Sequence, residues 1–101
     1  MKTTTKNITK NTAKTYRLPE TTTPENLETR FFTDCATFLT FGNKTLMAGY
    51  YYGGPNANSY FGAVYEFTTE DHTCEGEIKL TAVSEELFKD NGHAIAWAMA
   101  H

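Results

Sequence analysis

The middle of the chain restricts the possible folds more than any other segment. Residues 47–67 hold seven aromatic side chains, interrupted by a short run of small and turn-forming residues. Tyr, Phe and Val suit the pleated surface of a β-sheet. The interruption, Gly53-Gly54-Pro55-Asn56, supplies positive φ angles, a fixed φ angle and a missing N–H group, none of which suits a continuing strand. We therefore expect a β-hairpin here.

The residues around this hairpin extend the β pattern from residue 36 to residue 83. Four strands are expected, at about 36–42, 44–52, 60–69 and 76–83, and Gly42-Asn43 separates the first two. Strands that follow one another through short turns usually pair as neighbours. The prediction is an antiparallel meander.

The two aromatic strands differ from the last strand in the arrangement of their apolar residues. In the last strand Ile78, Leu80 and Ala82 alternate with polar residues, so one of its faces should meet water. The strands at 44–52 and 60–69 are apolar on both faces. Either helices cover both faces of the sheet centre, or one face presents aromatic side chains to a partner.

A helix is expected before the sheet, at about residues 24–34. Thr23-Pro24-Glu25 combines a hydroxyl N-cap, a proline at the first helical position and an acid in the first turn. Leu27 and Phe31 then follow at helical spacing.

Helical material is also expected after the sheet. Ser84-Glu85-Glu86 is a second helix-start signal, and Asp90-Asn91-Gly92 resembles a stop. In residues 93–101 four alanines favour helix, with Trp97 as a core anchor, although the alternation of apolar side chains also fits an edge strand.

The N-terminal segment has a different composition from the rest. Residues 1–23 are rich in Thr, Lys and Asn, and residues 1–17 carry five Lys and Arg with no acid. Such a segment lacks the apolar content that offsets the entropy of ordering, so we expect a mobile basic tail. The alternative is an edge strand with its lysines on one side. Residues 24–101 would then form a single α+β domain: a four-stranded antiparallel meander packed with an N-terminal helix and a C-terminal helical segment.

Size and composition exclude several classes of protein. With 101 residues, 40% of them hydrophobic, the chain suits one domain. It has no apolar run long enough to span a bilayer and no signal-like hydrophobic stretch near its start, so we expect a cytoplasmic protein with Cys35 and Cys74 reduced.

No group of residues predicts a metal, cofactor or catalytic site. His72 and Cys74 form the only closely spaced pair of metal-ligand types, whereas structural zinc sites usually need two such pairs. A cysteine nucleophile needs positive surroundings, but Cys74 follows Glu70 and Asp71 and precedes Glu75. The sequence thus predicts a protein that is not an enzyme.

Binding of single-stranded nucleic acid is one alternative function. Tyr50, Tyr52, Tyr60 and Tyr65 are of the type on which bases stack. A nucleic-acid-binding sheet normally interleaves such residues with Lys and Arg, yet Lys44 is the only basic residue between positions 44 and 69.

Protein binding is the function that the sequence favours. Residues 18–101 carry four Lys and Arg against all twelve Asp and Glu, a net charge of −8. A small acidic protein of this kind, such as those carried by phages and mobile elements, can inhibit a nucleic-acid-binding complex by presenting carboxylates in place of phosphates. The alternative for the aromatic hairpin is closure of the protein's own core or of a homodimer. The predicted partner-binding residues are Tyr50, Tyr51, Tyr52, Asn56, Asn58, Tyr60, Glu70, Asp71, Glu75 and Glu77.

Overall fold

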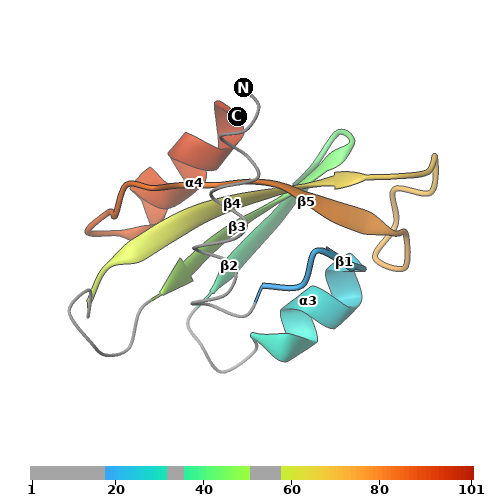
Figure 1. The fold of residues 1–101 in the computed structure, drawn as a ribbon, viewed down its shortest axis with the longest axis horizontal. Coiled ribbons are helices and arrows are strands. Elements are labelled where there is room, and N and C mark those ends of the chain that lie inside the picture. The colour runs from blue at the N-terminus through green and yellow to red at the C-terminus, as the bar shows by residue number, and fades with distance from the viewer. Residues whose placement is uncertain (1–17, 32–35, 51–57) are drawn as a thin grey trace.

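The predicted hairpin lies at the centre of a five-stranded antiparallel sheet (Figure 1). The computed structural model describes residues 18–31, 36–50 and 58–101. The strands run in the order β1-β5-β4-β3-β2, and their bounds are Thr21–Thr22 (β1), Thr37–Phe41 (β2), Lys44–Tyr50 (β3), Tyr60–Phe67 (β4) and Ile78–Val83 (β5). The α+β class and the antiparallel meander of β2 to β5 are confirmed. The number of strands is five rather than four.

The fifth strand, β1, comes from the segment that we expected to be a tail. Thr21 pairs with Lys79 and Thr22 with Ile78, so β1 forms an edge of the sheet next to β5. Leu18 is only 5% exposed, and the Tyr65 hydroxyl donates a hydrogen bond of 2.7 Å to the Pro19 carbonyl. Residues 18–22 are therefore held against the domain, and residues 1–17, with the lysines of the predicted tail, lie outside the described residues.

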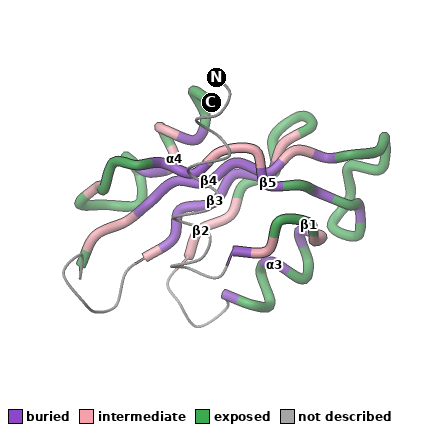
Figure 2. Tube along the Cα trace, viewed as in Figure 1, coloured by how far each residue is buried: buried purple, intermediate pink, exposed green. Residues whose placement is uncertain are grey.

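Helices cover both faces of the sheet centre, which explains why β3 and β4 are apolar on both sides (Figures 1 and 2). The first helix, α3 (Pro24–Arg30), lies over the face that carries Met47, Phe61 and Tyr65. The second, α4 (Asn91–Met99), packs over Leu46 and Val64 on the opposite face. Among the described residues, neither helix is long and apolar enough to cross a membrane.

The first helix starts where the sequence predicts. The Thr23 hydroxyl accepts a hydrogen bond of 3.2 Å from the backbone N–H of Asn26, and Pro24 occupies the first turn, where its missing N–H group costs nothing. The helix ends at Arg30. The end of the predicted range, residues 32–34, lies outside the described residues.

The helix start predicted at Ser84 is wrong. Ser84 instead continues the pairing with β4, because its N–H group donates to the Gly62 carbonyl (2.8 Å) and its hydroxyl accepts from the Gly62 N–H group (2.9 Å). Phe88 then pairs with Tyr60 through two backbone hydrogen bonds of 2.7 and 2.9 Å. Long-range pairing with β4 thus outweighs a local capping signal.

The segment Asp90-Asn91-Gly92 begins a helix, whereas we expected it to end one. The Asp90 carboxylate accepts a hydrogen bond of 2.8 Å from the His93 N–H group, as an N-cap does. Helix was the favoured prediction for residues 93–101, and it is confirmed, although α4 starts two residues earlier and ends at Met99.

A β-bulge changes the faces predicted for β5. Val64 pairs with Ala82 but Tyr65 pairs with Leu80, so Thr81 is the extra residue in β5, and its hydroxyl donates to the Val64 carbonyl (3.1 Å). Ile78, Leu80 and Val83 consequently lie on the α3 face of the sheet, whereas Ala82 joins α4 on the other face. The prediction that Ile78, Leu80 and Ala82 share one face is wrong at Ala82.

The close approach of α4 to the sheet depends on small residues. A Cβ atom on Gly62 would lie 2.7 Å from the Ala94 carbonyl oxygen and 2.7 Å from Cε3 of Trp97. Ala94 and Ala98 are fully buried on the helix side of the same contact. Gly62 is therefore needed for its lack of a side chain rather than for its backbone freedom.

We expect Gly62→Ala to lower the free energy of unfolding by about 1–3 kcal/mol, because α4 has to move away from β4. Urea unfolding followed by circular dichroism measures the change. The control is Gly92→Ala, since a Cβ atom there would meet only the end of the Asp90 side chain, at 3.3 Å. Equal stability of the Gly62 variant and the parent protein would contradict this account of how α4 is seated.

Candidate functional site

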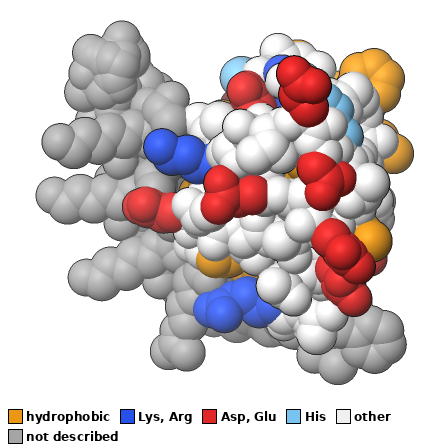
Figure 3. Space-filling view, turned by 90° about the vertical axis from the view of Figure 1, so that its right-hand side faces the viewer, with side chains coloured by type: hydrophobic (Ala, Val, Ile, Leu, Met, Phe, Trp, Pro, Cys, Tyr) orange, Lys and Arg blue, Asp and Glu red, His pale blue; other side chains and the backbone are white. Residues whose placement is uncertain are grey.

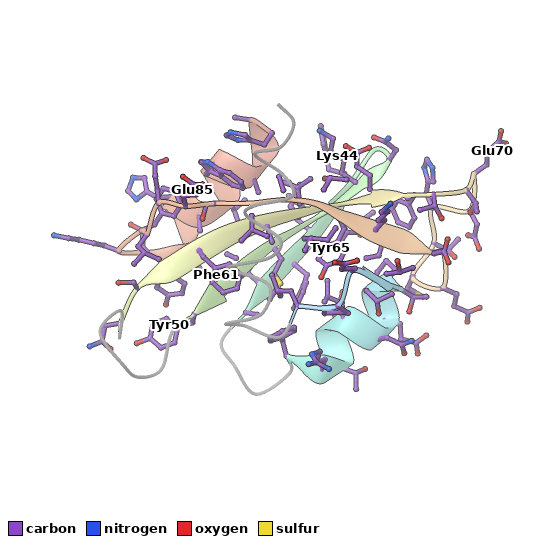
Figure 4. The ribbon with its side chains drawn as sticks, in the orientation of Figure 1. Lys44, Tyr50, Phe61, Tyr65, Glu70 and Glu85 are labelled. Atoms are coloured by element: carbon purple, nitrogen blue, oxygen red, sulfur yellow. The ribbon has the colours of Figure 1, made fainter. Side chains whose placement is uncertain are left out.

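The predicted partner-binding residues that the structure describes lie at two opposite ends of the molecule. Figure 4 shows Tyr50 and Glu70 far apart along the longest axis, with the sheet between them. Tyr50, Asn58 and Tyr60 form part of an aromatic end, and Tyr51, Tyr52 and Asn56 lie outside the described residues. The four acidic residues belong to the loop between β4 and β5. The structure therefore does not bring the predicted residues together into one site.

At the aromatic end the side chains contact one another. Tyr50 and Tyr60 are direct cross-strand partners, their ring centroids are 4.8 Å apart, and the rings are tilted by 52°. The Tyr50 hydroxyl donates a hydrogen bond of 2.6 Å to the Asn58 side-chain oxygen. Asn58 has a φ angle of 67°, a left-handed conformation that Asn tolerates better than most residues. Tyr50 and Tyr60 are half-buried, so these contacts stabilise the end of the hairpin.

The aromatic residues further along β4 belong to the core. Phe61, Tyr65 and Phe67 lie in the cluster beneath α3, and Tyr65 has no exposed surface. Burial raises the pKa of the Tyr65 hydroxyl far above its ordinary value, although the nearby Arg30 charge acts in the opposite direction. Tyr65 is thus not on a surface where a base could stack.

The acidic loop, residues 68–77, is held in shape by its own hydrogen bonds. The Asp71 carboxylate accepts from the Thr73 hydroxyl (2.6 Å) and from the Thr73 N–H group (3.1 Å), and the Asp71 N–H group donates to the Thr69 hydroxyl (3.2 Å). The Thr68 hydroxyl donates to the Glu77 carboxylate across the loop (2.5 Å). The loop therefore forms a hydrogen-bonded frame.

Gly76 and His72 complete this frame. A Cβ atom on Gly76 would overlap the Asp71 carbonyl oxygen, so only glycine allows the chain to close here. The His72 ring stacks on Phe67 with centroids 4.7 Å apart, which joins the loop to the core. Glu70 and Glu75 project into solvent from this frame.

The start of α3 adds two further acids beside the loop. The Glu25 N–H group donates a hydrogen bond of 3.0 Å to the Cys74 carbonyl. Glu25, Glu28, Thr29 and Cys74 line a shallow pocket of about 500 Å³. Figure 3 shows Asp and Glu side chains spread over this side of the molecule, with a few Lys and Arg side chains beside them. We call Glu25, Glu28, Glu70, Asp71, Glu75 and Glu77 the acidic end.

Glu25 and Glu28 are not among the site residues predicted from the sequence. In the sequence Glu25 indicates a helix start, and it does lie in the first turn of α3. The acids of the loop follow more than 40 residues after Glu28. Only the contact between α3 and Cys74 brings the two acids beside the loop. A local motif search has no means of finding such a pair.

The residues considered for metal binding and nucleophilic catalysis do not come together in the described part of the chain. No group of three or more His, Cys, Asp or Glu side chains there is arranged to hold a metal ion. Cys74 is an exposed free thiol, and His93 lies at the start of α4 with its ring nitrogen 2.8 Å from the Asp90 carboxylate. Cys35 lies outside the described residues.

A family model described as "nucleotide modification associated domain 4" matches residues 18–101. The chain belongs to this family. The match starts at Leu18, the first residue that the structure shows buried against the sheet, and covers every strand and helix described above. Comparison with curated proteins and with solved structures found no significant match.

The Thr73 hydrogen bonds lower the pKa of Asp71 below its ordinary value of 3.8, with the side-chain hydroxyl as the largest cause. We expect Thr73→Val to raise this pKa partway back, because the backbone N–H group still donates. Carboxyl NMR titration measures the pKa directly. Thr69→Val is the control, since the Thr69 hydroxyl bonds the Asp71 N–H group and not its carboxylate.

The sign of the linkage follows from the lowered pKa. These hydrogen bonds favour the folded loop above the ordinary pKa of Asp71 and are lost as the pH falls through the lowered value. An Asp71 pKa that is the same in Thr73→Val and the parent protein would show that the hydroxyl does not hold the carboxylate.

Proposed function

We propose that this domain of the nucleotide modification associated domain 4 family is a non-enzymatic, cytoplasmic protein-binding module. Its acidic end contacts a basic surface of a protein that handles nucleic acid or nucleotides. The observation that carries the proposal is the gathering of six carboxylate side chains from α3 and the β4–β5 loop on one rigid end of the molecule. The family description supports a partner connected with nucleotide modification.

The charges of the acidic end are close together and exposed to solvent. All six acids of the acidic end are exposed, so each can attract a basic side chain of a partner while both groups are still hydrated. A concentrated field of one sign accelerates encounter with a surface of opposite sign and repels surfaces of the same sign. Nucleic acid is repelled, whereas the basic groove of a nucleic-acid-binding protein is attracted.

The rigidity of the loop strengthens the case for a specific contact. Carboxylates on a loose loop have to be ordered on binding, which costs conformational entropy. In this loop the carboxylates of Asp71 and Glu77 are already hydrogen-bonded, and Gly76 closes the chain, so less ordering remains to occur on binding. Fixed carboxylates are the form of acidic surface that is able to take the place of backbone phosphates. We therefore propose inhibition of a nucleic-acid-binding complex as the action of this surface.

Single-stranded nucleic-acid binding is the less favoured alternative. Of the stacking candidates, Tyr65 is buried, while Tyr50 and Tyr60 contact each other and are half-buried. Lys44 is the one basic residue of β3 and β4, and its ammonium group donates a hydrogen bond of 3.0 Å to the His101 carbonyl. A phosphate-binding surface would need more positive charge than these strands carry.

The experiment compares capture of partners by the full chain and by two charge-reversed variants. Glu70→Lys/Glu75→Lys changes the acidic end, and Glu85→Lys/Glu86→Lys makes the same change in net charge near the other end of the molecule, where Figure 4 labels Glu85. Nuclease-treated lysate removes partners held through nucleic acid. We expect a defined protein to be retained by the parent and by the Glu85/Glu86 variant, and its affinity for the Glu70/Glu75 variant to fall about tenfold, mostly through slower association.

A charge-preserving variant tests placement separately from charge. Gly76→Ala keeps every carboxylate but forces the loop out of its closed shape, so we expect it to weaken the same partner at an unchanged net charge. Equal binding of all variants would exclude the acidic end as the contact surface. Loss of every partner after nuclease treatment, with direct binding of a single-stranded oligonucleotide, would instead support the alternative function.

A further inference from the structure

The strand β2 forms an edge of the sheet and lacks the usual protection of such an edge. In the part of the chain that the structure describes, β3 is its only neighbouring strand. Its residues, Thr37–Phe41, include no charge and no proline, and its register with β3 is regular over all five residues. Natural edge strands usually carry a lysine, a proline or a bulge that prevents pairing with another chain. Among the described residues, the outer edge of β2 is thus open to a further strand.

An exposed apolar strip runs along β2 on the face that carries α4. Leu39 is 42% exposed, Phe41 60% and Met99 55%. The Asn91 side chain donates a hydrogen bond of 3.0 Å to the Thr37 hydroxyl, so this side of α4 faces β2. Met99 is the last residue of α4, and the end of this helix lies near the Phe41 end of the strand, because the Lys44 ammonium group, across from Phe41, donates a hydrogen bond of 3.0 Å to the His101 carbonyl. The three exposed apolar side chains therefore belong to the same face of the sheet, Leu39 and Phe41 on its edge strand and Met99 at the end of the helix that covers this face.

The sequence of β2 allows antiparallel pairing with a second copy of itself. When two copies of Thr37-Phe38-Leu39-Thr40-Phe41 run antiparallel about Leu39, each Thr37 faces Phe41 of the other copy and each Phe38 faces Thr40. Leu39 then meets Leu39 of the other copy on the two-fold axis. Phe with Thr and Leu with Leu are favourable cross-strand neighbours, and no charges of like sign meet. We propose that a second copy of this chain pairs with β2 and joins the two sheets into one ten-stranded sheet.

The backbone of β2 is oriented for this pairing. Phe41 pairs with Lys44 across the two-residue turn Gly42-Asn43, where Gly42 has a φ angle of 62°. In a hairpin of this length the pair that closes the turn directs its backbone groups inward, and alternate residues direct theirs outward. Phe38 and Thr40 therefore present their N–H and C=O groups at the outer edge. In the proposed register, the backbone groups of Phe38 in one copy face those of Thr40 in the other copy.

A second copy fits this edge better than the basic partner proposed for the acidic end. The strand has no charge to attract a basic surface, whereas it is complementary to itself in side-chain size and in backbone hydrogen bonding. An isologous contact of this kind closes at two copies. The pairing is independent of the function proposed above, because no residue of the acidic end takes part.

Disulfide trapping tests the register. Leu39→Cys is introduced into the full chain with Cys35→Ala and Cys74→Ala, and mild oxidation is followed by non-reducing electrophoresis. Leu39 would occupy a pair without backbone hydrogen bonds, where Cα atoms are about 4.5 Å apart, within the range that a disulfide needs. Leu87→Cys in the same background is the control, since Leu87 is 41% exposed and lies outside β2. We expect rapid cross-linking of the Leu39 variant alone.

Sedimentation velocity tests the assembly itself. At about 100 µM, where a dimer with a dissociation constant near 1 µM is nearly complete, we expect the full chain to have twice the monomer mass. Leu39→Lys should halve that mass, while Leu87→Lys and the Glu70→Lys/Glu75→Lys variant should remain dimeric. A monomeric parent protein, or equal cross-linking at the two cysteine positions, would overturn the proposal. A monomer is also the result expected if another segment of the same chain covers β2.

Discussion

The burial of β3 and β4 on both faces is the constraint on which the rest of the structure depends. Met47, Phe61 and Tyr65 bind the sheet to α3, while Leu46 and Val64 bind it to α4. Each face has to pack against a helix, because strands that are apolar on both sides would otherwise expose a large hydrophobic patch to water. Residues 18–22 are joined to the same core by the buried Leu18 side chain and by the hydrogen bond from the Tyr65 hydroxyl to the Pro19 carbonyl. The helix before the meander, α3, covers one face of the sheet, and the helix after it, α4, covers the other.

The fold was largely predictable because its local signals agree with its packing. The aromatic strands, the turn at Gly42-Asn43 and the capped start at Thr23 each favour the structure that the core also requires. The errors occur where long-range contacts decide. Ser84 has the composition of an N-cap, yet pairing with Gly62 makes it an extension of β5. The bulge at Thr81 leaves no signal in the alternation of residues 78–83, and only pairing with Val64 and Tyr65 reveals it.

The candidate site was predictable in part, for the same reason. The acids of the β4–β5 loop are close in the sequence and stay together in space, held by the bonds of Asp71 and Glu77. Their neighbours Glu25 and Glu28 reach them only through the contact of α3 with Cys74. The prediction placed Tyr50 and Tyr60 in the same site as these acids. It was wrong because residues that are close in the sequence can still lie at opposite ends of an extended strand. The two ends of β4 place these residues at opposite ends of the molecule (Figure 4).

The proposed pairing through β2 determines where the two acidic ends would lie in the dimer. The β4–β5 loop lies beyond the end of β4 that carries Phe67, whose N–H group donates to the Asn43 carbonyl in the β2–β3 turn, so the acidic end is at the Phe41 end of β2. Because two copies of β2 would run antiparallel, the two acidic ends of the proposed dimer would lie at opposite ends of the joined sheet. They would be too far apart to form one continuous acidic groove. Each copy would then bind its own basic partner, and the dimer would gain affinity only where the target itself offers two such surfaces.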